Sequence, residues 1–424
     1  MSTLAALSAC TAGGSTPPGT PPSVGAASTG SAHSESSPPP TTPTPTPTPA
    51  IITTSAGATQ QINPVTPVTV SIAHGTLTSV TMTNAAGTKV TGALSPDRTS
   101  WHDTEDLGYG KTYAIIAVGK NDEGMPVTKR ESVTVISPTN QTAVSLDRAG
   151  DYALTDGATY GVAVMPEIFF DEPLSAAGQK TAEKALTVST SPHVAGAWAW
   201  QDDTRLLWRP ENYWPSGTNV TIKANVYGVD FGNGLYGQSD EQTSFTIGRK
   251  QLTIADDNAP KAVDKIRVYN AAGTVLRTMD TSMGQHSGET VNGQYFNFYT
   301  LNGTYTVLEH DNPAIMSSQS YGLPAGAANG YGALTVPYST KISVDGIYLH
   351  EFNSTTYDQE HGIDVSEGCL NLQTSDAEWF FDHSLIGDPV VVHGAKGAPE
   401  IDVAEGGGWS VSWKTWLTGA LSNN

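Results

Sequence analysis

The chain has 424 residues, a length that accommodates roughly two to four domains, each with its own hydrophobic core. Charged residues make up only 15% of it, whereas Gly, Ser, Thr and Pro are abundant, which is typical of all-β proteins outside the cytoplasm. A formal net charge of −20 without any run of Lys and Arg excludes a nucleic-acid-binding protein. Because no stretch of about 18 apolar residues occurs, no membrane-spanning helix is predicted.

The N-terminal sequence LAALSACT, at residues 4–11, places the small residues Ser8 and Ala9 directly before Cys10. It resembles the lipobox of bacterial lipoproteins, whose cysteine is acylated after signal cleavage. The resemblance implies a signal remnant at 1–9, a lipid on Cys10, and an exported chain anchored to the outer face of the cytoplasmic membrane. A basic segment before the apolar one is missing, so either the start codon lies upstream or the match arises by chance.

Residues 10–53 consist mostly of Gly, Ser, Pro and Thr and end in repeated Thr-Pro dipeptides. Such a segment cannot bury a core, and its prolines keep it extended. We predict a disordered tether that spaces the folded part of the chain from a surface.

Two β-rich modules are predicted next, at residues 54–137 and 138–249. In the first, alternating apolar residues between turn signals predict short strands at 68–72, 77–82, 111–118 and 131–136. This spacing favours an immunoglobulin-like β-sandwich.

The second module is rich in aromatic residues, namely Trp198, Trp200, Trp208, Tyr213 and Trp214. They form either a glycan-binding platform or the core of a second immunoglobulin-like sandwich. Their alternation within strands favours the core. Neither module contains a motif for chemistry.

The stretch SEGCLN at 366–371 holds Cys369, the only cysteine besides Cys10. A predicted strand at 346–350 ends on His350, and apolar spacing at 375–383 predicts a helix after a Ser or Asp cap. A cysteine on a tight Gly turn between a strand and a helix is surrounded by backbone N–H groups, which stabilise both a thiolate and an oxyanion. Cys369 and His350 are therefore candidates for thiol nucleophilic catalysis if the fold brings them together.

The ordinary alternative for Cys369 is a small apolar residue buried in a core. Two observations favour a nucleophile: the flanks of Cys369 are turn-forming and polar, and an idle free thiol is a liability in an exported protein. If Cys10 is lipidated, Cys369 has no partner within the chain, which excludes a disulfide framework.

Residues 250–394 resemble the catalytic domain of the L,D-transpeptidases of bacterial cell-wall synthesis. The segments that carry the resemblance are the hairpin at 265–277, NGTYTVL at 302–308, YGLP at 321–324, SEGCLN at 366–371 and DAEWFFDH at 376–383. The lipobox, the tether and the two immunoglobulin-like modules resemble the actinobacterial lipoprotein members of the family. The sequence WSVSWKTW at 409–416 resembles part of a small C-terminal subdomain, here 395–424, that packs against the catalytic domain in such proteins.

The resemblance implies a mainly β catalytic domain with a short helix after the cysteine. It implies Cys369 as nucleophile, His350 as general base and acid, and the N–H groups of Gly368 and Cys369 as oxyanion donors. Two positions depart from the family. Glu351 follows the histidine where Ser is usual, so we expect it to orient His350 through its backbone. Glu367 stands where His is usual, and its charge is expected to raise the pKa of the Cys369 thiol.

Residues that the resemblance places in the substrate cleft are Met316, Tyr321, Ser366, Glu367 and Asn371. The ordinary alternatives are core packing for Met316 and Tyr321 and a helix cap for Asn371. The loop at 352–364 is expected to form a lid over the cleft. The segment 285–296 is longer than the usual connection and is expected to reshape the donor pocket.

The implied reaction is acyl transfer between peptidoglycan stem peptides. Cys369 attacks the carbonyl before the terminal D-Ala of a donor tetrapeptide, and the resulting thioester passes to the side-chain amine of a third-position residue, giving a 3→3 cross-link. Neither a cofactor nor a metal is expected, because the sequence shows no ligand cluster with the Cys/His spacing of a zinc site. Carbapenems are expected to acylate Cys369.

Three other functions are compatible with parts of this pattern. An L,D-carboxypeptidase would release the same thioester to water, and a non-catalytic cell-wall-binding lipoprotein would have a decayed site, which Glu351 and Glu367 favour. A sortase-like transpeptidase is set aside, because it requires an arginine after the cysteine strand and residues 369–393 contain none.

Overall fold

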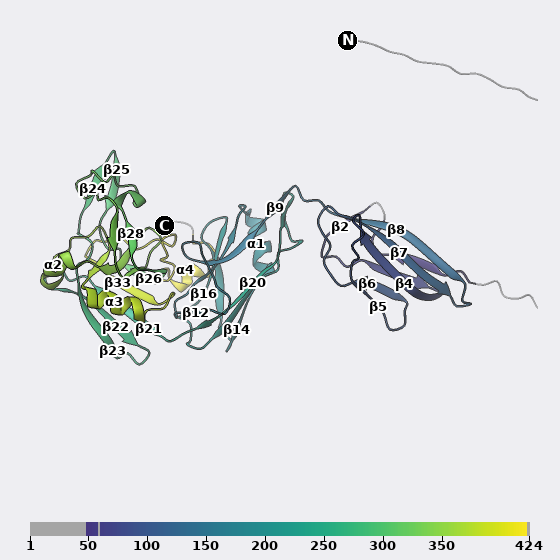
Figure 1. Cartoon of the computed structure of the whole chain (residues 1–424), viewed down its shortest axis with the longest axis horizontal. Helices are drawn as coiled ribbons and strands as arrows, with labels where there is room; N and C mark the ends of the chain where they lie inside the picture. The colour runs from purple at the N-terminus through teal and green to yellow at the C-terminus, as the bar shows by residue number, and fades with distance from the viewer. Residues whose placement is uncertain (1–47, 58–59, 422–424) are drawn as a thin grey trace, which may run out of the picture. The chain divides into compact units, whose positions relative to one another are not determined.

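The computed structural model describes residues 48–57 and 60–421. The predicted signal remnant, the predicted lipid site Cys10 and almost all of the predicted tether lie outside these residues. The described part is built mainly from β-strands, as predicted, with a few short helices (Figure 1). Within it, no helix combines the length and apolarity that a membrane crossing requires.

The first module is a β-sandwich with the sheet orders β1-β3-β6-β5 and β2-β8-β7-β4. Its strands are β1 (Ile51–Thr54), β2 (Gln61–Ile62), β3 (Thr69–Ala73), β4 (Gly75–Asn84), β5 (Gly92–Leu94), β6 (Ser100–Asp103), β7 (Thr112–Asn121) and β8 (Pro126–Val135). Alternate residues of β3 and β7, such as Val70 and Ile115, are buried between the sheets. All four predicted strands are present. Because β1 pairs with β3, the folded module begins at Ile51 rather than at 54.

The second module has sheets of the orders β11-β10-β13-β16-β15, β12-β20-β17-β14 and β18-β19-β9. Its elements are β9 (Asn140–Thr142), β10 (Val144–Arg148), β11 (Tyr152–Ala153), β12 (Thr159–Tyr160), β13 (Pro166–Phe170), α1 (Ala176–Ala185), β14 (Leu186–Ser191), β15 (Gly196–Trp200), β16 (Arg205–Pro210), β17 (Asn219–Ala224), β18 (Asp230–Gly232), β19 (Leu235–Gly237) and β20 (Glu241–Ile247).

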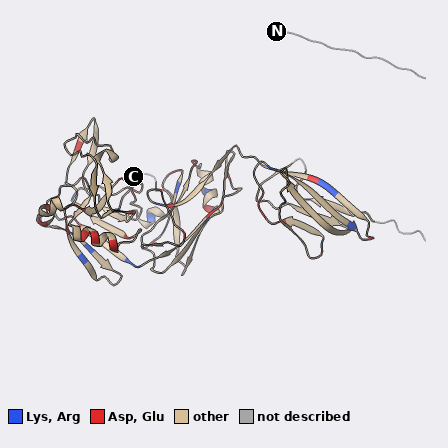
Figure 2. Ribbon diagram, in the orientation of Figure 1, with Lys and Arg blue, Asp and Glu red and all other residues tan. Residues whose placement is uncertain are grey.

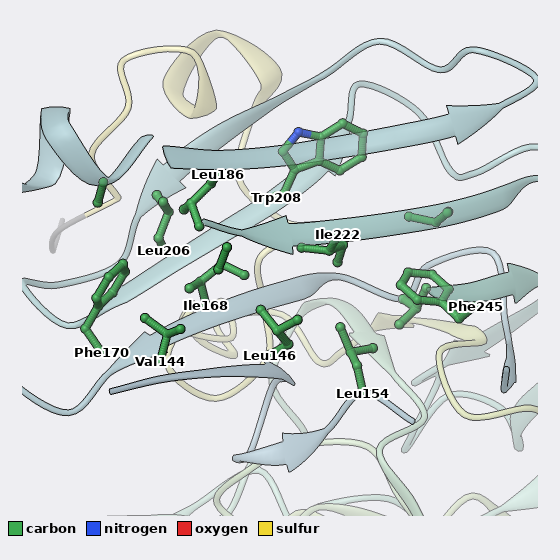
Figure 3. Packing of buried hydrophobic residues seen from close by; sticks show 14 of the residues in the cluster. Val144, Leu146, Leu154, Ile168, Phe170, Leu186, Leu206, Trp208, Ile222 and Phe245 are labelled. Atoms are coloured by element: carbon green, nitrogen blue, oxygen red, sulfur yellow. The ribbon is translucent and has the colours of Figure 1, made fainter. Parts of the chain in front are cut away.

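The aromatic residues of this module form its core, as the alternation predicted. Trp200, Trp208 and Trp214 are buried with the aliphatic residues of the facing sheets, and Trp208 stacks on Trp214 with 4.9 Å between ring centroids. Figure 3 shows Trp208 in the same packed cluster as Leu186, Leu206 and Ile168. Trp198 and Tyr213 pack, partly buried, at the edge of the same cluster.

The third domain contains a five-stranded sheet of order β23-β22-β21-β33-β26 and a four-stranded sheet of order β27-β30-β31-β32. Its elements are β21 (Gln251–Asp256), β22 (Asp264–Asn270), β23 (Val275–Thr281), β24 (Gly288–Val291), β25 (Gln294–Asn297), β26 (Gly303–Thr306), β27 (Glu309–Asp311), β28 (Ala314–Met316), the 3₁₀ helix η1 (Ser318–Tyr321), β29 (Leu334–Val336), β30 (Ser339–Lys341), β31 (Tyr348–Glu351), η2 (Asn353–Thr355), α2 (Thr356–His361), β32 (Leu370–Leu372), α3 (Thr374–His383) and β33 (Pro389–His393). The predicted hairpin at 265–277 corresponds to β22 and β23.

The strands β31 and β32 run parallel and position the candidate site. Their register places Leu349 opposite Leu370 and His350 opposite Asn371. Because successive side chains alternate across a strand, the leucines enter the core while His350 and Asn371 share the other face. Parallel neighbours need a crossover connection, and η2 and α2 supply it here. The segment predicted as a lid, 352–364, is therefore largely this helical crossover, which packs against β23 and β32.

The helix α3 follows β32, as predicted, but its predicted Ser or Asp cap is wrong. The helix begins at Thr374 after Gln373, whose side chain makes no capping hydrogen bond. The backbone N–H of Thr374 instead donates to Asn353 Oδ1 at 3.1 Å, so η2 satisfies the first turn. Ala377 and Phe380 are buried, and the outer face carries the acidic residues visible in Figure 2.

The C-terminal segment 395–421 contacts both the third domain and the second module. Ile401 joins the core of the third domain, and its N–H donates to the carbonyl of Asn302 at 2.8 Å. Trp416, in α4 (Trp413–Trp416), is fully buried against Met165 and Leu207 of the second module. The segment therefore packs against the third domain, as expected, and also against the second module, which was not expected.

Candidate active site

The turn that carries Cys369 is held by side-chain hydrogen bonds. Ser366 Oγ donates to the Cys369 carbonyl at 2.7 Å and accepts from the Gly368 N–H at 3.1 Å. Thr300 Oγ1 donates to the Gly368 carbonyl at 2.9 Å. Gly368 has a φ of +132°, and a Cβ there would lie 2.6 Å from Ile347 Cδ1, so the turn requires glycine. The cysteine is thereby fixed at the start of β32.

One of the two predicted oxyanion donors, the Gly368 N–H, makes a hydrogen bond within the turn. The Gly368 N–H donates to Ser366 Oγ in this structure, so its role as an oxyanion donor stays a prediction that requires this bond to be exchanged for one to substrate. The Cys369 N–H is the predicted donor that this bond leaves available. Ser366, predicted to bind substrate, primarily fixes the turn, although it also lines the cavity beside Cys369.

His350 is held in one tautomer by the main chain. Its Nδ1 lies 3.0 Å from the carbonyl oxygen of Glu351. A carbonyl only accepts, so Nδ1 carries the hydrogen and Nε2 carries the lone pair needed by a base. The ring is 5% exposed and packs edge-on against Phe352. The backbone of Glu351 thus plays the orienting part expected of it.

Cys369 and His350 line one cavity of about 230 Å³. Asn371, Met316 and Glu367 line the same cavity, as the sequence predicted. The structure therefore brings the predicted nucleophile and base to a common space, although they stand 19 positions apart in the sequence.

Burial keeps both groups uncharged. Desolvation lowers the pKa of His350 to about 4, against the smaller opposing effect of the bond to Glu351. Desolvation raises the pKa of the Cys369 thiol to about 12; the Tyr348 backbone N–H opposes this, and the charges of Glu367 and Asp345 add to it. The expected effect of Glu367 on the thiol is present but secondary to burial. At neutral pH the pair is a thiol and a neutral imidazole, and the thiol lies 3.7 Å from the carbonyl of Gly346.

Two further cavities share lining residues with the one that Cys369 and His350 line, and only the first is lined by Cys369. One of about 300 Å³ is lined by Cys369, Glu367 and Tyr321, together with Tyr295 and Phe296 of the β24–β25 hairpin. The other, of about 450 Å³, is lined by Met316 and Tyr321. Tyr321 and Met316 therefore line the cleft, as predicted, and the long segment 285–296 shapes one of its walls.

The segment that covers the cleft is 314–336, not the predicted lid at 352–364. It runs from β28 through η1 to β29, and its Tyr331 lines all three cavities. Of the predicted lid, only Phe352 lines one of these three cavities. Its Gly, Asn and Thr content suggested mobility, but those residues form the crossover between two parallel strands.

Several residues around the site carry no signal in the sequence: Tyr331, Asp345 and Tyr348 line the cavities, and Thr300 holds the turn that carries Cys369. They stand in loops or at strand ends without a motif. Tyr331 follows a Gly- and Ala-rich stretch at 322–330. Such a stretch between two short strands is the one signal that could have indicated a loop over the cleft.

A group of titratable residues also lies near the nucleophile turn, residues 366–369. One ligand atom each from Asp257, His286 and Asp364 lie within 4.8 Å of one another. These positions are far apart in the sequence, so spacing gave no sign of them.

Comparison with known proteins agrees with this arrangement. Residues 261–392 match the L,D-transpeptidase catalytic domain family, and residues 59–230 match a bacterial Ig domain family. The chain is 36% identical to L,D-transpeptidase 2 of Mycobacterium tuberculosis strain CDC 1551 over 83% of this chain and 80% of that protein. It is 33% identical to L,D-transpeptidase 5 of strain H37Rv over 86% and 75%. Among solved structures, an LD transpeptidase in complex with imipenem aligns with 26% identity and a TM-score of 0.45, over 58% of this chain and 98% of that one.

Proposed function

This chain belongs to the L,D-transpeptidase family, and on that premise we propose that it forms 3→3 cross-links between peptidoglycan stem peptides. The acyl group passes through a thioester on Cys369. The observation that carries this proposal is the cavity shared by Cys369 and His350, with the Nε2 lone pair of His350 set by the carbonyl of Glu351.

The first half-reaction breaks the bond between the third residue of the donor stem and its terminal D-Ala. As the sulfur of Cys369 bonds to the carbonyl carbon, the thiol proton moves to His350 Nε2. The Cys369 N–H donates to the developing oxyanion. When the tetrahedral adduct collapses, the C–N bond breaks, and His350 gives the proton to the departing D-Ala amine. Because the thiol and the imidazole both start neutral, no preformed ion pair is required.

The second half-reaction transfers the acyl group to an amine of a neighbouring stem. As the amine nitrogen bonds to the thioester carbon, His350 Nε2 accepts a proton from it, the C–S bond breaks, and the thiolate regains that proton. Glu367 and Asp345 line the space beside Cys369 and give it a negative charge. An acidic wall attracts an ammonium group before it is deprotonated. This favours an amine acceptor over water, and so a transpeptidase over an L,D-carboxypeptidase.

We place the enzyme outside the cytoplasmic membrane, in the cell-wall zone, with Cys10 as the site of a lipid anchor. The lipobox-like sequence before Cys10 and the Thr-Pro-rich stretch after it support this placement. A lipid on Cys10 would make the following segment a spacer between the membrane and the folded modules.

Intact-mass spectrometry of the described part of the chain tests the proposal. The wild type and Cys369→Ala are each incubated with imipenem and, separately, with a disaccharide-tetrapeptide. We expect a drug adduct on the wild type and a cross-linked dimer that has lost one D-Ala, with neither product from the variant.

Loss of D-Ala without a dimer would assign the L,D-carboxypeptidase activity instead. If a wild-type protein with a native circular dichroism spectrum gives neither adduct nor product, the enzyme proposal is wrong. The cell-wall-binding alternative would then take its place.

A further inference from the structure

The buried group of Asp257, His286 and Asp364 comes from three separate parts of the third domain. Asp257 follows β21, His286 lies between β23 and β24, and Asp364 stands two residues before Ser366 of the nucleophile turn. The side chains of Asp257 and Asp364 are only 2% and 4% exposed, and that of His286 is 29% exposed. The group therefore opens to solvent on the histidine side alone.

Hydrogen bonding within this group is incomplete. His286 Nε2 lies 2.8 Å from Asp257 Oδ2 and 3.1 Å from Asp364 Oδ2. A single N–H has one hydrogen and cannot serve both oxygens well. Among the described residues, Asp257 Oδ1 and Asp364 Oδ2 are buried oxygens without a hydrogen-bond partner.

A third carboxylate, that of Asp264, lies next to Asp364. Asp264, at the start of β22, is fully buried, and its Oδ2 has no hydrogen-bond partner among the described residues. Its other oxygen accepts the Ala259 N–H at 2.9 Å, so the carboxylate is held in this orientation.

The charge of this group needs compensation. Three carboxylates and one imidazole, largely removed from water, repel one another unless protons or a cation neutralise them. Protonation of one or more of the carboxylates is one solution. A cation is the other, and it would also satisfy the unpartnered oxygens.

We propose that Asp257, His286 and Asp364 bind a divalent first-row transition-metal cation, with Asp264 as a fourth, supporting carboxylate. A cation bonded to ligand atoms at about 2.0–2.2 Å holds them at most about 4.4 Å apart, so the observed group needs only a slight contraction. An imidazole among carboxylates favours ions from Mn²⁺ to Zn²⁺ over Ca²⁺ or Mg²⁺. The cation takes the place of the Nε2 hydrogen between the two carboxylates.

The site supports the nucleophile without touching substrate. Asp364 Oδ1 accepts the Met283 N–H at 2.6 Å, and the Ser366 N–H donates to the Met283 carbonyl at 3.2 Å. His286 stacks on Tyr299, with 5.6 Å between ring centroids, and Tyr299 lines the cavity beside Cys369. A bound cation therefore fixes both the approach to the catalytic turn and one wall of the cleft.

Metal titration of the whole described chain, freed of metal with a chelator, tests this proposal. Calorimetry with MnCl₂ and with ZnCl₂ is expected to show one equivalent bound, and the midpoint of thermal unfolding is expected to rise by a few degrees. His286→Gln and Asp364→Asn are expected to weaken the affinity at least ~10-fold. His393→Gln is the matched control, because His393 forms a comparable pair with Asp256 at 2.8 Å in the same domain and is more exposed.

A second measurement uses the wild type alone, in case a variant fails to fold. Bound Mn²⁺ is expected to broaden the ring NMR signals of His286 at concentrations that leave those of His102, in the first module, unchanged. The proposal is overturned if no stoichiometric binding occurs, if His393→Gln weakens binding as much as His286→Gln, or if broadening at His286 is no stronger than at His102. Protons would then be the compensating charge. These assays need no substrate, so their failure leaves the proposed transferase activity untouched.

Discussion

The carbonyl oxygen of Glu351 accepts the Nδ1–H of His350 at 3.0 Å, although a glutamate stands where serine is usual after the histidine. The Glu351 side chain turns elsewhere, and its Oε1 accepts the Asn353 N–H at 3.1 Å. The orientation of the base is therefore a property of the backbone at the end of β31.

Replacement of Glu351 by Ser or Ala is consequently expected to change the acylation rate by less than ~3-fold, since the carbonyl remains. His350→Gln, in contrast, removes the base and is expected to lower the rate ~100-fold or more. Stopped-flow acylation by imipenem measures both. A large loss in Glu351→Ser with native thermal stability would show that the carboxylate itself takes part.

The pH dependence of thiol reactivity follows from the raised pKa of Cys369, about 12. Below that pKa the thiolate fraction rises tenfold per pH unit, so the rate of alkylation by iodoacetamide is expected to climb without a plateau from pH 6 to pH 10. The urea-unfolded chain is the control, and its rate should bend near the ordinary thiol pKa of about 8.5 and level off about one pH unit higher. A plateau in the folded protein below pH 8 would indicate a preformed thiolate–imidazolium pair, contrary to the neutral pair described here.

Substitution of Glu367 separates the two half-reactions. Glu367→Gln removes a charge that raises the thiol pKa, so acylation by imipenem is expected to become faster, by ~3-fold or more. The same change removes part of the acidic wall, so the KM for the acceptor amine is expected to rise several-fold and to lose some of its salt dependence. Steady-state kinetics with varied acceptor at two ionic strengths measures this. Equal effects on both half-reactions would contradict a role in acceptor binding.

Burial of Trp416 makes the C-terminal segment a large contributor to stability. The ring is fully buried, its Nε1–H donates to the Ala197 carbonyl at 2.9 Å, and Arg209 lies over it at 4.4 Å. Trp416→Ala is expected to lower the free energy of unfolding by about 3–5 kcal/mol. Leu417→Ala is the neighbouring control, because Leu417 is 58% exposed and its loss should cost less than about 0.5 kcal/mol. Urea unfolding followed by tryptophan fluorescence compares the two.

The sequence predicted the parts of the fold whose signal is local. Alternation located the strands of the first module and the core of the second, and the turn chemistry around Cys369 pointed to the site. The turn and strand around them made Cys369 and His350 candidates, the family resemblance implied their roles, and the structure places both side chains on one cavity.

What could not be predicted depends on pairing between distant strands. The segment 352–364 looked like a mobile loop, because nothing in its composition reveals that β31 and β32 are parallel and need a crossover. The Gly368 N–H looked available until the Ser366 side chain was placed beside it. Tyr331 and Asp345 reach the cleft from loops. Loops have no regular periodicity from which the direction of a side chain could be predicted.

The return of the C-terminal segment to β15 has a consequence for the order in which the protein folds. The Trp200 N–H donates to the Gly419 carbonyl at 2.9 Å, and the Trp200 carbonyl accepts from Leu421 at 2.7 Å. Trp416 and the Ala197 carbonyl that it bonds are separated by 219 positions. Synthesis delivers the chain from its N-terminus, so the second module emerges long before the residues that seal it. Until they arrive, the apolar surface around Ala199 and Leu207 lacks the Trp416 side chain that covers it in the folded protein.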